Sequence, residues 1–187
     1  MAAAAVDAVF ALFAAHGSGD YVGEAVSQEQ HATQAAALAA AAGLEPAVVA
    51  ASLLHDVGHM VGLAEPTAHG RMGDCGTVAH EGVGASWLAD LRFAPRVAAL
   101  VRRHVDAKRY LCAVDAGYEA RLSPASRTTL GYQGGPMAAD EVARFNADAE
   151  KDVILKMRGF DEAAKDPAAV VPPLASYRAL LEALVEA

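Results

Sequence analysis

Cysteine is scarce in this sequence of 187 residues, which contains only Cys75 and Cys112. Two cysteines cannot form the dense disulfide framework of a small secreted domain. Neither belongs to a CxxC pair or lies near enough to histidines to indicate a zinc site. We therefore expect reduced thiols and a cytoplasmic protein.

Basic residues are also few. The chain has 15 lysines and arginines against 23 aspartates and glutamates, which gives a formal net charge of −8 and a sequence pI near 5.3. Nucleic-acid-binding surfaces carry an excess of basic residues, so this composition speaks against one. We expect no nucleic-acid partner.

Long hydrophobic runs are missing as well. The longest, AAALAAAAGL at residues 35–44, is too short to span a bilayer and ends at Glu45 and Pro46. The alanine-rich segment 1–17 lacks the basic start of a signal peptide and contains Asp7. We expect an ordinary first helix there and no membrane partner.

Alanine and helical periodicity fill most of the chain, and no alternating β pattern of useful length occurs. Ser27 and Gln30 form a capping box before a helix that runs to about Gly43, and Pro46 suits the first turn of the next helix. Ser123-Pro124 opens a shorter one, while the remaining helices are expected at 4–15, 80–91, 94–111, 138–158 and 173–186. Residues 62–78 and 130–137 are expected as glycine-rich loops. The prediction is an all-α chain, folded as a single compact bundle over residues 1–187.

Histidines and aspartates near the ends of the expected helices carry the chemistry. Six of them stand out: His31, His55, Asp56, His80, His104 and Asp161. Asp161 is expected to follow a helix that ends near Arg158. Several helix ends of a bundle can converge on one site, and imidazole with carboxylate suits iron, manganese, zinc or nickel.

His55 and Asp56 are the most informative pair because they end the apolar run in ASLLHDVGHM. Burying the Asp56 carboxylate without a cation would be costly, and a metal ion would compensate its charge. A simple hydrogen-bonded His–Asp pair is the alternative that the spacing leaves open. His16 and His69 are assigned ordinary structural or surface roles.

The motif H…HD…D resembles the motif of the HD-domain superfamily of helical metalloproteins. It is filled here by His31, His55, Asp56 and Asp161. Most members are phosphohydrolases that use one or two divalent metals to activate water. The additional His80 and His104 resemble members with two metals, in which Asp56 would be shared. A phosphohydrolase acting on a phosphomonoester or nucleotide is thus one interpretation, and an HD domain that only binds metal or a ligand is another.

Four segments outside this motif carry a more specific signal: DYVGEAVSQEQH (20–31), HEGVGASWL (80–88), HVDAKRYL (104–111) and LSPASRTTLGYQGGPM (122–137). They are similar to the HD-domain di-iron oxygenases that act on 2-amino-1-hydroxyethylphosphonate. The resemblance implies two iron ions in a mixed-valent Fe(II)/Fe(III) pair, with O2 as co-substrate. It also implies cleavage of the carbon–phosphorus bond to glycine and phosphate, in phosphonate catabolism.

The same resemblance assigns the metal ligands and the residues at the second iron. The first iron would be held by His31, His55, Asp56 and Asp161, and the second by Asp56, His80 and His104. Tyr21 would cap the second iron until substrate displaces it, and Glu24 would bind the substrate amine. If this segment is helical, the two side chains share a face. A loop tyrosine beside a solvated glutamate is the ordinary alternative.

A phosphonate dianion requires cations and hydrogen-bond donors around it. Lys108 lies one turn beyond His104, and Ser126 and Thr129 are three residues apart in a short helix whose N-terminus favours an anion. Further substrate contacts are expected from His59, Gln133 and Arg158. The expected catalytic residues are Tyr21, Glu24, His59 and Lys108. We expect a small organophosphonate as the partner of a monomer or small homo-oligomer.

Overall fold

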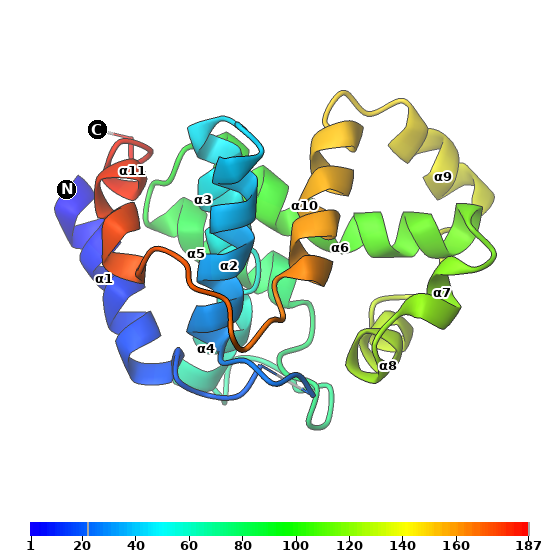
Figure 1. Ribbon diagram of the computed structural model, residues 1–187, viewed down its shortest axis with the longest axis horizontal. Helices are drawn as coiled ribbons and strands as arrows, with labels where there is room; N and C mark the ends of the chain where they lie inside the picture. The colour runs from blue at the N-terminus through cyan, green and yellow to red at the C-terminus, as the bar shows by residue number, and fades with distance from the viewer. Residues whose placement is uncertain (22, 187) are drawn as a thin grey trace.

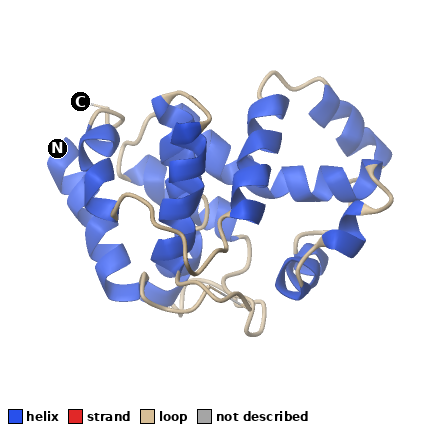
Figure 2. Cartoon of the chain, viewed as in Figure 1, coloured by secondary structure: helices blue, strands red, loops and turns tan. Residues whose placement is uncertain are grey.

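The computed structural model describes residues 1–21 and 23–186, and within them helices are joined by turns and loops (Figures 1 and 2). The elements are α1 Ala2–His16, α2 Gln28–Ala41, α3 Pro46–Leu54, α4 Val57–Ala64, α5 His80–Asp90, α6 Pro95–Val114, α7 Tyr118–Arg121, α8 Pro124–Tyr132, α9 Ala139–Asn146, α10 Lys151–Ala163, the 3-10 helix η1 Leu174–Tyr177 and α11 Arg178–Glu182. No strand occurs among these described residues, apart from three isolated β-bridges. The all-α prediction is confirmed.

Helices α2, α3, α5, α6 and α10 form the centre of the molecule. Helix α6 packs against α3, α5 and α10, and α2 packs against α3 and α10. Their apolar faces meet in a core that includes the fully buried side chains of Leu53, Leu54, Leu100 and Ile154. Figure 1 shows α1 and α11 with both chain ends on one side of this centre, and α7, α8 and α9 on the other. The helices that carry the six candidate metal ligands therefore meet in the middle of the fold.

Local sequence signals set the start of α2. The Ser27 hydroxyl accepts a hydrogen bond from the Gln30 N–H at 3.2 Å, and the Gln30 side chain accepts one from the Ser27 N–H at 2.9 Å. This is the predicted capping box, which satisfies two backbone donors that a helix start leaves free. Because the helix begins here, His31 lies in its first turn and points into the protein, where it is buried.

The segment 138–158 is not one helix, and Asp161 does not follow its end. The chain turns between α9 and α10, where the Asp148 side chain accepts a hydrogen bond from the Glu150 N–H at 2.7 Å. Aspartate favours such local bonds over continued helix, so the polar run interrupts the periodicity. Beyond it, α10 continues through Gly159 to Ala163, because a single glycine weakens a helix without ending it. Asp161 consequently projects from within α10.

His55 and Asp56 occupy the break between α3 and α4, where the chain bends by 44°. After the bend, the backbone of α4 lies against that of α5. The approach is so close that a Cβ added to Gly58 would lie 2.0 Å from the His80 carbonyl oxygen. Helix α4 and helix α8 both run slightly into the segments expected as loops, 62–78 and 130–137.

By length and composition, none of the helices in the described part of the chain could cross a membrane alone, and only the bent pair of α3 and α4 meets these criteria together.

Candidate metal centre and adjoining cavity

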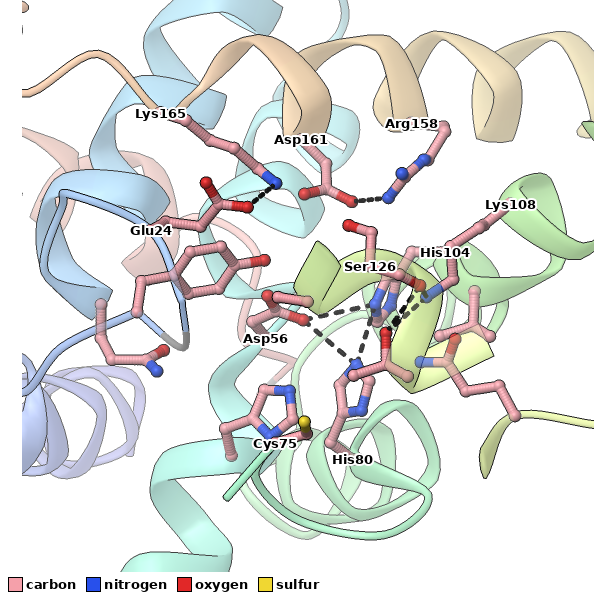
Figure 3. Close-up of a pocket in the computed structure, with 17 residues that line it drawn as sticks. Glu24, Asp56, Cys75, His80, His104, Lys108, Ser126, Arg158, Asp161 and Lys165 are labelled. Carbon is pink, nitrogen blue, oxygen red and sulfur yellow. Dashed lines mark hydrogen bonds and ion pairs between the residues drawn. The ribbon is translucent and has the colours of Figure 1, made fainter. Parts of the chain in front are cut away.

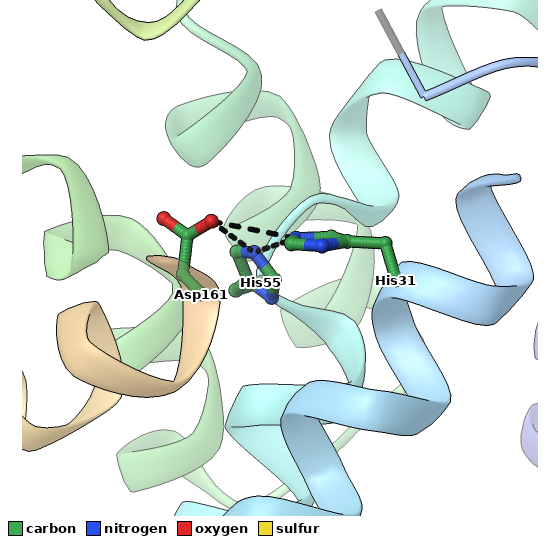
Figure 4. Close-up of side chains that lie close together, drawn as sticks. All are labelled: His31, His55 and Asp161. Carbon is green, nitrogen blue, oxygen red and sulfur yellow. Dashed lines mark hydrogen bonds and ion pairs between the residues drawn. The ribbon is translucent and has the colours of Figure 1, made fainter. Parts of the chain in front are cut away.

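The six candidate ligands form two groups of three. His31, His55 and Asp161 make one group, drawn in Figure 4, and Asp56, His80 and His104 make the other. Within each group, one potential ligand atom per residue lies within 4.8 Å of the others. The structure thus brings together all six residues that the sequence singled out, from four helices and the α3–α4 break.

Asp56 faces both groups with different oxygen atoms. Its Oδ1 lies 3.2 Å from Nε2 of His80 and 3.3 Å from Nε2 of His104 (Figure 3). Its Oδ2 lies 3.3 Å from Nε2 of His55 and 3.7 Å from Nε2 of His31. One carboxylate therefore offers an oxygen to each of two positions, which is the arrangement of a bridging ligand.

Backbone carbonyls fix the tautomers of three of the histidines. In each, Nδ1 is hydrogen-bonded to a carbonyl oxygen: His31 to Ala164 at 2.9 Å, His55 to Ser52 at 2.8 Å and His104 to Val101 at 2.7 Å. A carbonyl can only accept, so Nδ1 carries the proton and Nε2 of the neutral ring presents a lone pair. Such partners orient histidine ligands in metal sites.

The facing lone pairs test whether these residues fit metal ions. Nε2 of His31 lies 3.1 Å from Nε2 of His55, so two lone pairs face each other unless a cation, either a proton or a metal ion, lies between them. In the second group, the lone pair on Nε2 of His104 faces Oδ1 of Asp56 at 3.3 Å, and Nε2 of His80 lies 3.1 Å from the same nitrogen. A cation in each group removes this repulsion and neutralises the buried carboxylates. The donor set therefore fits two metal ions held by nitrogen and oxygen.

The pKa values of these residues also reflect the need for a positive charge beside the buried carboxylates. Burial lowers the pKa of His31 to about 4, with a further contribution from the His55 charge. Burial also opposes protonation of His55, but Asp56 outweighs it and raises the pKa of His55 to about 9. Despite burial, His55 holds the pKa of Asp56 well below its usual range. Without a metal, a proton on His55 supplies the cation that the carboxylate requires.

Arg158 supports Asp161 from the other side. Its Nη1 donates to Oδ2 of Asp161 at 2.5 Å, and its Nε donates to the Tyr118 hydroxyl at 2.9 Å. Although burial opposes it, this guanidinium holds the pKa of Asp161 below its ordinary value. Oδ1 of Asp161 remains directed at His31, at 3.4 Å from Nε2. Arg158 therefore orients a candidate ligand, in addition to bordering the cavity described next.

A cavity opens beside the second group (Figure 3). The predicted site residues that line it are Tyr21, Glu24, Asp56, His59, His80, His104, Lys108, Ser126, Thr129, Gln133, Arg158 and Asp161. His31 and His55 do not line it, because they lie behind the carboxylates and are buried. All predicted substrate-contacting residues thus face one space, next to the two metal positions.

Lys108 forms the cationic wall of this cavity. Its Nζ donates to the Thr129 hydroxyl at 2.8 Å and to the Ser126 carbonyl oxygen at 3.2 Å. The side chain is buried, and no carboxylate of the described residues makes hydrogen-bonding contact with it. Burial, followed by the Arg158 charge, lowers the pKa of Lys108 to about 8. Because its hydrogen-bond partners here are neutral oxygen atoms, this ammonium should bind an anion favourably.

Tyr21 and Glu24 lie in the loop between α1 and α2, so the helical face considered for them does not form. A turn connects them instead, in which the Glu24 N–H donates to the Tyr21 carbonyl at 2.9 Å and Gly23 has a φ of 73°. The Tyr21 ring stacks on His31 with centroids 3.8 Å apart. Burial and the nearby carboxylates of Asp56 and Asp161 raise the pKa of Tyr21 well above 10. The phenol therefore keeps its proton in the metal-free protein.

His59 stacks on the ring of His80, with centroids 3.9 Å apart. Its Nδ1 accepts a hydrogen bond from the Thr77 N–H at 3.0 Å. Burial, with the His80 charge, lowers the pKa of His59 well below 6.5, so the ring is neutral and its proton resides on Nε2. His59 can therefore serve as a hydrogen-bond donor at the cavity.

Five residues that line the cavity were not predicted: Gln28, Cys75, Val105, Ala125 and Lys165. Cys75 belongs to the glycine-rich segment 62–78, whose length was a general signal for a site wall. Lys165 lies just after α10 and forms an ion pair with Glu24 at 2.6 Å. No motif marks Lys165, because its position depends on contacts with the distant helix α2.

Two comparisons with known proteins indicate the same family. Residues 29–149 match the HD domain. The chain is 34% identical to [1-hydroxy-2-(trimethylamino)ethyl]phosphonate dioxygenase (glycine-betaine-forming) of Leisingera caerulea, over 97% of this chain and 90% of that protein. It is 36% identical to hydroxymethylphosphonate dioxygenase of Gimesia maris, over 97% of this chain and 88% of that protein. An uncharacterized protein of Acanthamoeba polyphaga mimivirus is 35% identical, over 94% of this chain and 80% of that protein.

These similarities extend over nearly the whole chain, beyond the HD motif itself. They agree with the site, in which two groups of histidine and aspartate adjoin a cavity with Lys108 in its wall. The chain belongs to the HD-domain family, in the branch that contains these hydroxyphosphonate dioxygenases.

Proposed function

We propose that the protein uses O2 to cleave the carbon–phosphorus bond of a small 1-hydroxyphosphonate, with 2-amino-1-hydroxyethylphosphonate as the substrate and glycine and phosphate as products. The observation that carries this proposal is the Asp56 carboxylate, which directs one oxygen to each ligand group beside a cavity with Lys108 in its wall. Relatives that are named as dioxygenases of hydroxyphosphonates support the same reaction class.

The proposed reaction balances with O2 alone. One molecule each of 2-amino-1-hydroxyethylphosphonate and O2 contains the atoms of one glycine and one phosphate. The carbon–phosphorus bond breaks, the hydroxyl-bearing carbon is oxidised to a carboxylate, and O2 supplies both added oxygen atoms. No external reductant is consumed over a complete cycle.

Two iron ions, in a mixed-valent Fe(II)/Fe(III) pair, would be held by His31, His55, Asp56 and Asp161 and by Asp56, His80 and His104. When bound, they supply the redox chemistry that amino-acid side chains cannot provide for O2. Histidine and carboxylate ligands are suited to non-haem iron, although they also accept other metals. Metal loading is therefore part of the test.

The residues around the cavity bind and orient the substrate. Lys108 pairs with a phosphonate oxygen, and Ser126 and Thr129 border the same region. His59 donates a hydrogen bond from its Nε2–H to a substrate oxygen. Tyr21, whose ring covers His31, excludes water from the metal positions until substrate enters.

The deciding experiment compares the iron-loaded protein with and without O2. With 2-amino-1-hydroxyethylphosphonate, we expect aerobic O2 consumption with equal amounts of glycine and phosphate, and no turnover under anaerobic conditions. Chelated protein serves as the control for metal dependence.

The outcome also separates the two chemistries that share these ligands. Phosphate release from a phosphomonoester or nucleotide without O2, together with no O2 uptake on the phosphonate, would instead assign the site to an HD phosphohydrolase.

Anion binding in the cavity is expected to depend on pH through Lys108. Because the pKa of Lys108 is about 8, it is charged below that pH and loses its charge as pH rises. Affinity for a phosphonate should therefore fall roughly 25-fold between about pH 7.5 and pH 9.5, as the charged fraction of Lys108 falls. Calorimetric titration of the metal-loaded protein with ethylphosphonate measures this change.

Two variants isolate the contribution of Lys108. Lys108→Arg keeps its charge over this range and should flatten the pH profile. Lys156→Met, which removes an exposed lysine of α10, should retain the wild-type profile. An unchanged slope in Lys108→Arg would show that another group controls the pH dependence.

A further inference from the structure

The carboxylate proposed to receive the substrate amine already has an ammonium partner within the chain. Nζ of Lys165 lies 2.6 Å from Oε1 of Glu24, and both side chains are largely buried, at 18% and 15% exposure. Both residues line the cavity. In Figure 3 this pair lies on one side of the cavity, while Lys108 and Ser126 lie on the other.

Lys165 is held in place by its backbone neighbours. The Ala164 carbonyl accepts a hydrogen bond from Nδ1 of His31. On the other side, the Asp166 N–H donates to Oε1 of Gln34 at 3.1 Å, and the Asp166 carbonyl accepts from Nε2 of Gln34 at 3.0 Å. Segment 164–166 is thus fastened to α2 both before and after Lys165.

The surroundings of Lys165 stabilise its charge at this position. Its Nζ also lies 5.8 Å from the centroid of the Tyr21 ring, within the range of a cation–π contact. The Glu24 turn is itself joined to Tyr21 by a backbone hydrogen bond. Glu24, Lys165 and Tyr21 therefore form one connected unit in the wall of the cavity.

We propose that Lys165 is a specificity-determining residue, which competes with a substrate ammonium group for the Glu24 carboxylate. This inference rests on the proposed function and refines its substrate class. A substrate with a primary amine must replace Lys165 on Glu24, which exchanges one ion pair for another. A substrate without a cationic group leaves the pair intact and gains nothing from Glu24. The amino acid at position 165 thereby sets the preference between amino and non-amino phosphonates.

Binding measurements on two ligands that differ only in the amine test this role. The ligands are 2-aminoethylphosphonate and ethylphosphonate, titrated calorimetrically into iron-loaded protein under anaerobic conditions. In Lys165→Met the amino ligand should bind about tenfold more tightly than in the wild type, whereas ethylphosphonate should change less than about threefold. In Glu24→Gln the amino ligand should bind about tenfold more weakly.

Two further variants make the test independent of folding defects. Lys165→Arg keeps the cation and should retain the wild-type ratio of the two affinities. The double variant Glu24→Gln/Lys165→Met lacks both partners and should bind the two ligands with similar affinity. Circular dichroism and the unfolding midpoint of each variant report its folding.

The results distinguish this inference from the proposed reaction. Equal weakening of both ligands in Lys165→Met would make Lys165 a phosphonate-binding cation and overturn the inference. An unchanged affinity ratio would overturn it as well. If hydroxyphosphonates are not turned over but the ratio shifts as expected, the reaction is wrong while the role of Lys165 holds.

Discussion

Asp56→Asn is expected to lower turnover roughly 1000-fold or more, which corresponds to about 4 kcal/mol of activation free energy. Asparagine has nearly the same shape, but it is neutral and has only one oxygen that can bind a metal. In the wild type, Oδ1 faces His80 and His104 while Oδ2 faces His55. The variant can therefore serve only one of the two groups, and we expect at most one tightly bound metal ion per chain.

Metal analysis of the purified variant, together with O2 uptake, measures both effects. Asp90→Asn provides a matched control, because Asp90 is an exposed residue at the end of α5. It should keep two metal ions and wild-type turnover. Two bound metal ions with normal O2 uptake in Asp56→Asn would contradict the bridging role.

Gly58→Ala is expected to destabilise the protein by about 2–4 kcal/mol and to impair the second metal position. The added Cβ would lie 2.0 Å from the His80 carbonyl oxygen and 2.7 Å from the Gly84 nitrogen, and both atoms belong to backbone that cannot rotate away. Helices α4 and α5 must then separate. His80 begins α5, so its imidazole should move away from Asp56.

Gly159→Ala is the matched control for this substitution. Gly159 lies on the exposed face of α10, and a Cβ there would meet nothing within 4 Å. Because alanine favours helix, this control should be neutral or more stable by about 0.5–1 kcal/mol. Denaturant unfolding gives both values, and metal content reports the state of the site. An unchanged unfolding free energy in Gly58→Ala would show that α4 and α5 can separate without loss.

Residue types and helical spacing were enough to predict the all-α class, most of the longer helices and the metal-ligand candidates. His31, His55, Asp56 and His80 lie near helix ends, as expected, and the need to compensate a buried carboxylate indicated a cation. His104 was expected late in its helix but lies in the middle of α6, because that helix continues to Val114. The tautomers of His55 and His104 depend on a carbonyl three residues earlier, whereas the tautomer of His31 could not be predicted because a distant carbonyl sets it. For His31 that carbonyl belongs to Ala164, in a segment far along the chain.

The same dependence on distant contacts explains what the sequence did not indicate. Lys165 is placed by hydrogen bonds between its neighbours and α2, and a lysine after a helix ordinarily suggests only a solvated charge. Asp161 was expected beyond a helix that ends near Arg158. In the structure α10 continues past Gly159, and Arg158 pairs with Asp161 from the preceding turn.

The ligand group of His31, His55 and Asp161 joins positions that are far apart in the sequence. A metal ion bound there would act as a removable cross-link, comparable to a disulfide between the two ends of a very long loop. Cross-links over long loops restrict the unfolded chain most strongly, and binding to the folded state alone adds further stabilisation. The same ions that serve catalysis would thereby fasten α2 to α10, so that chelation loosens the fold as well as ending turnover.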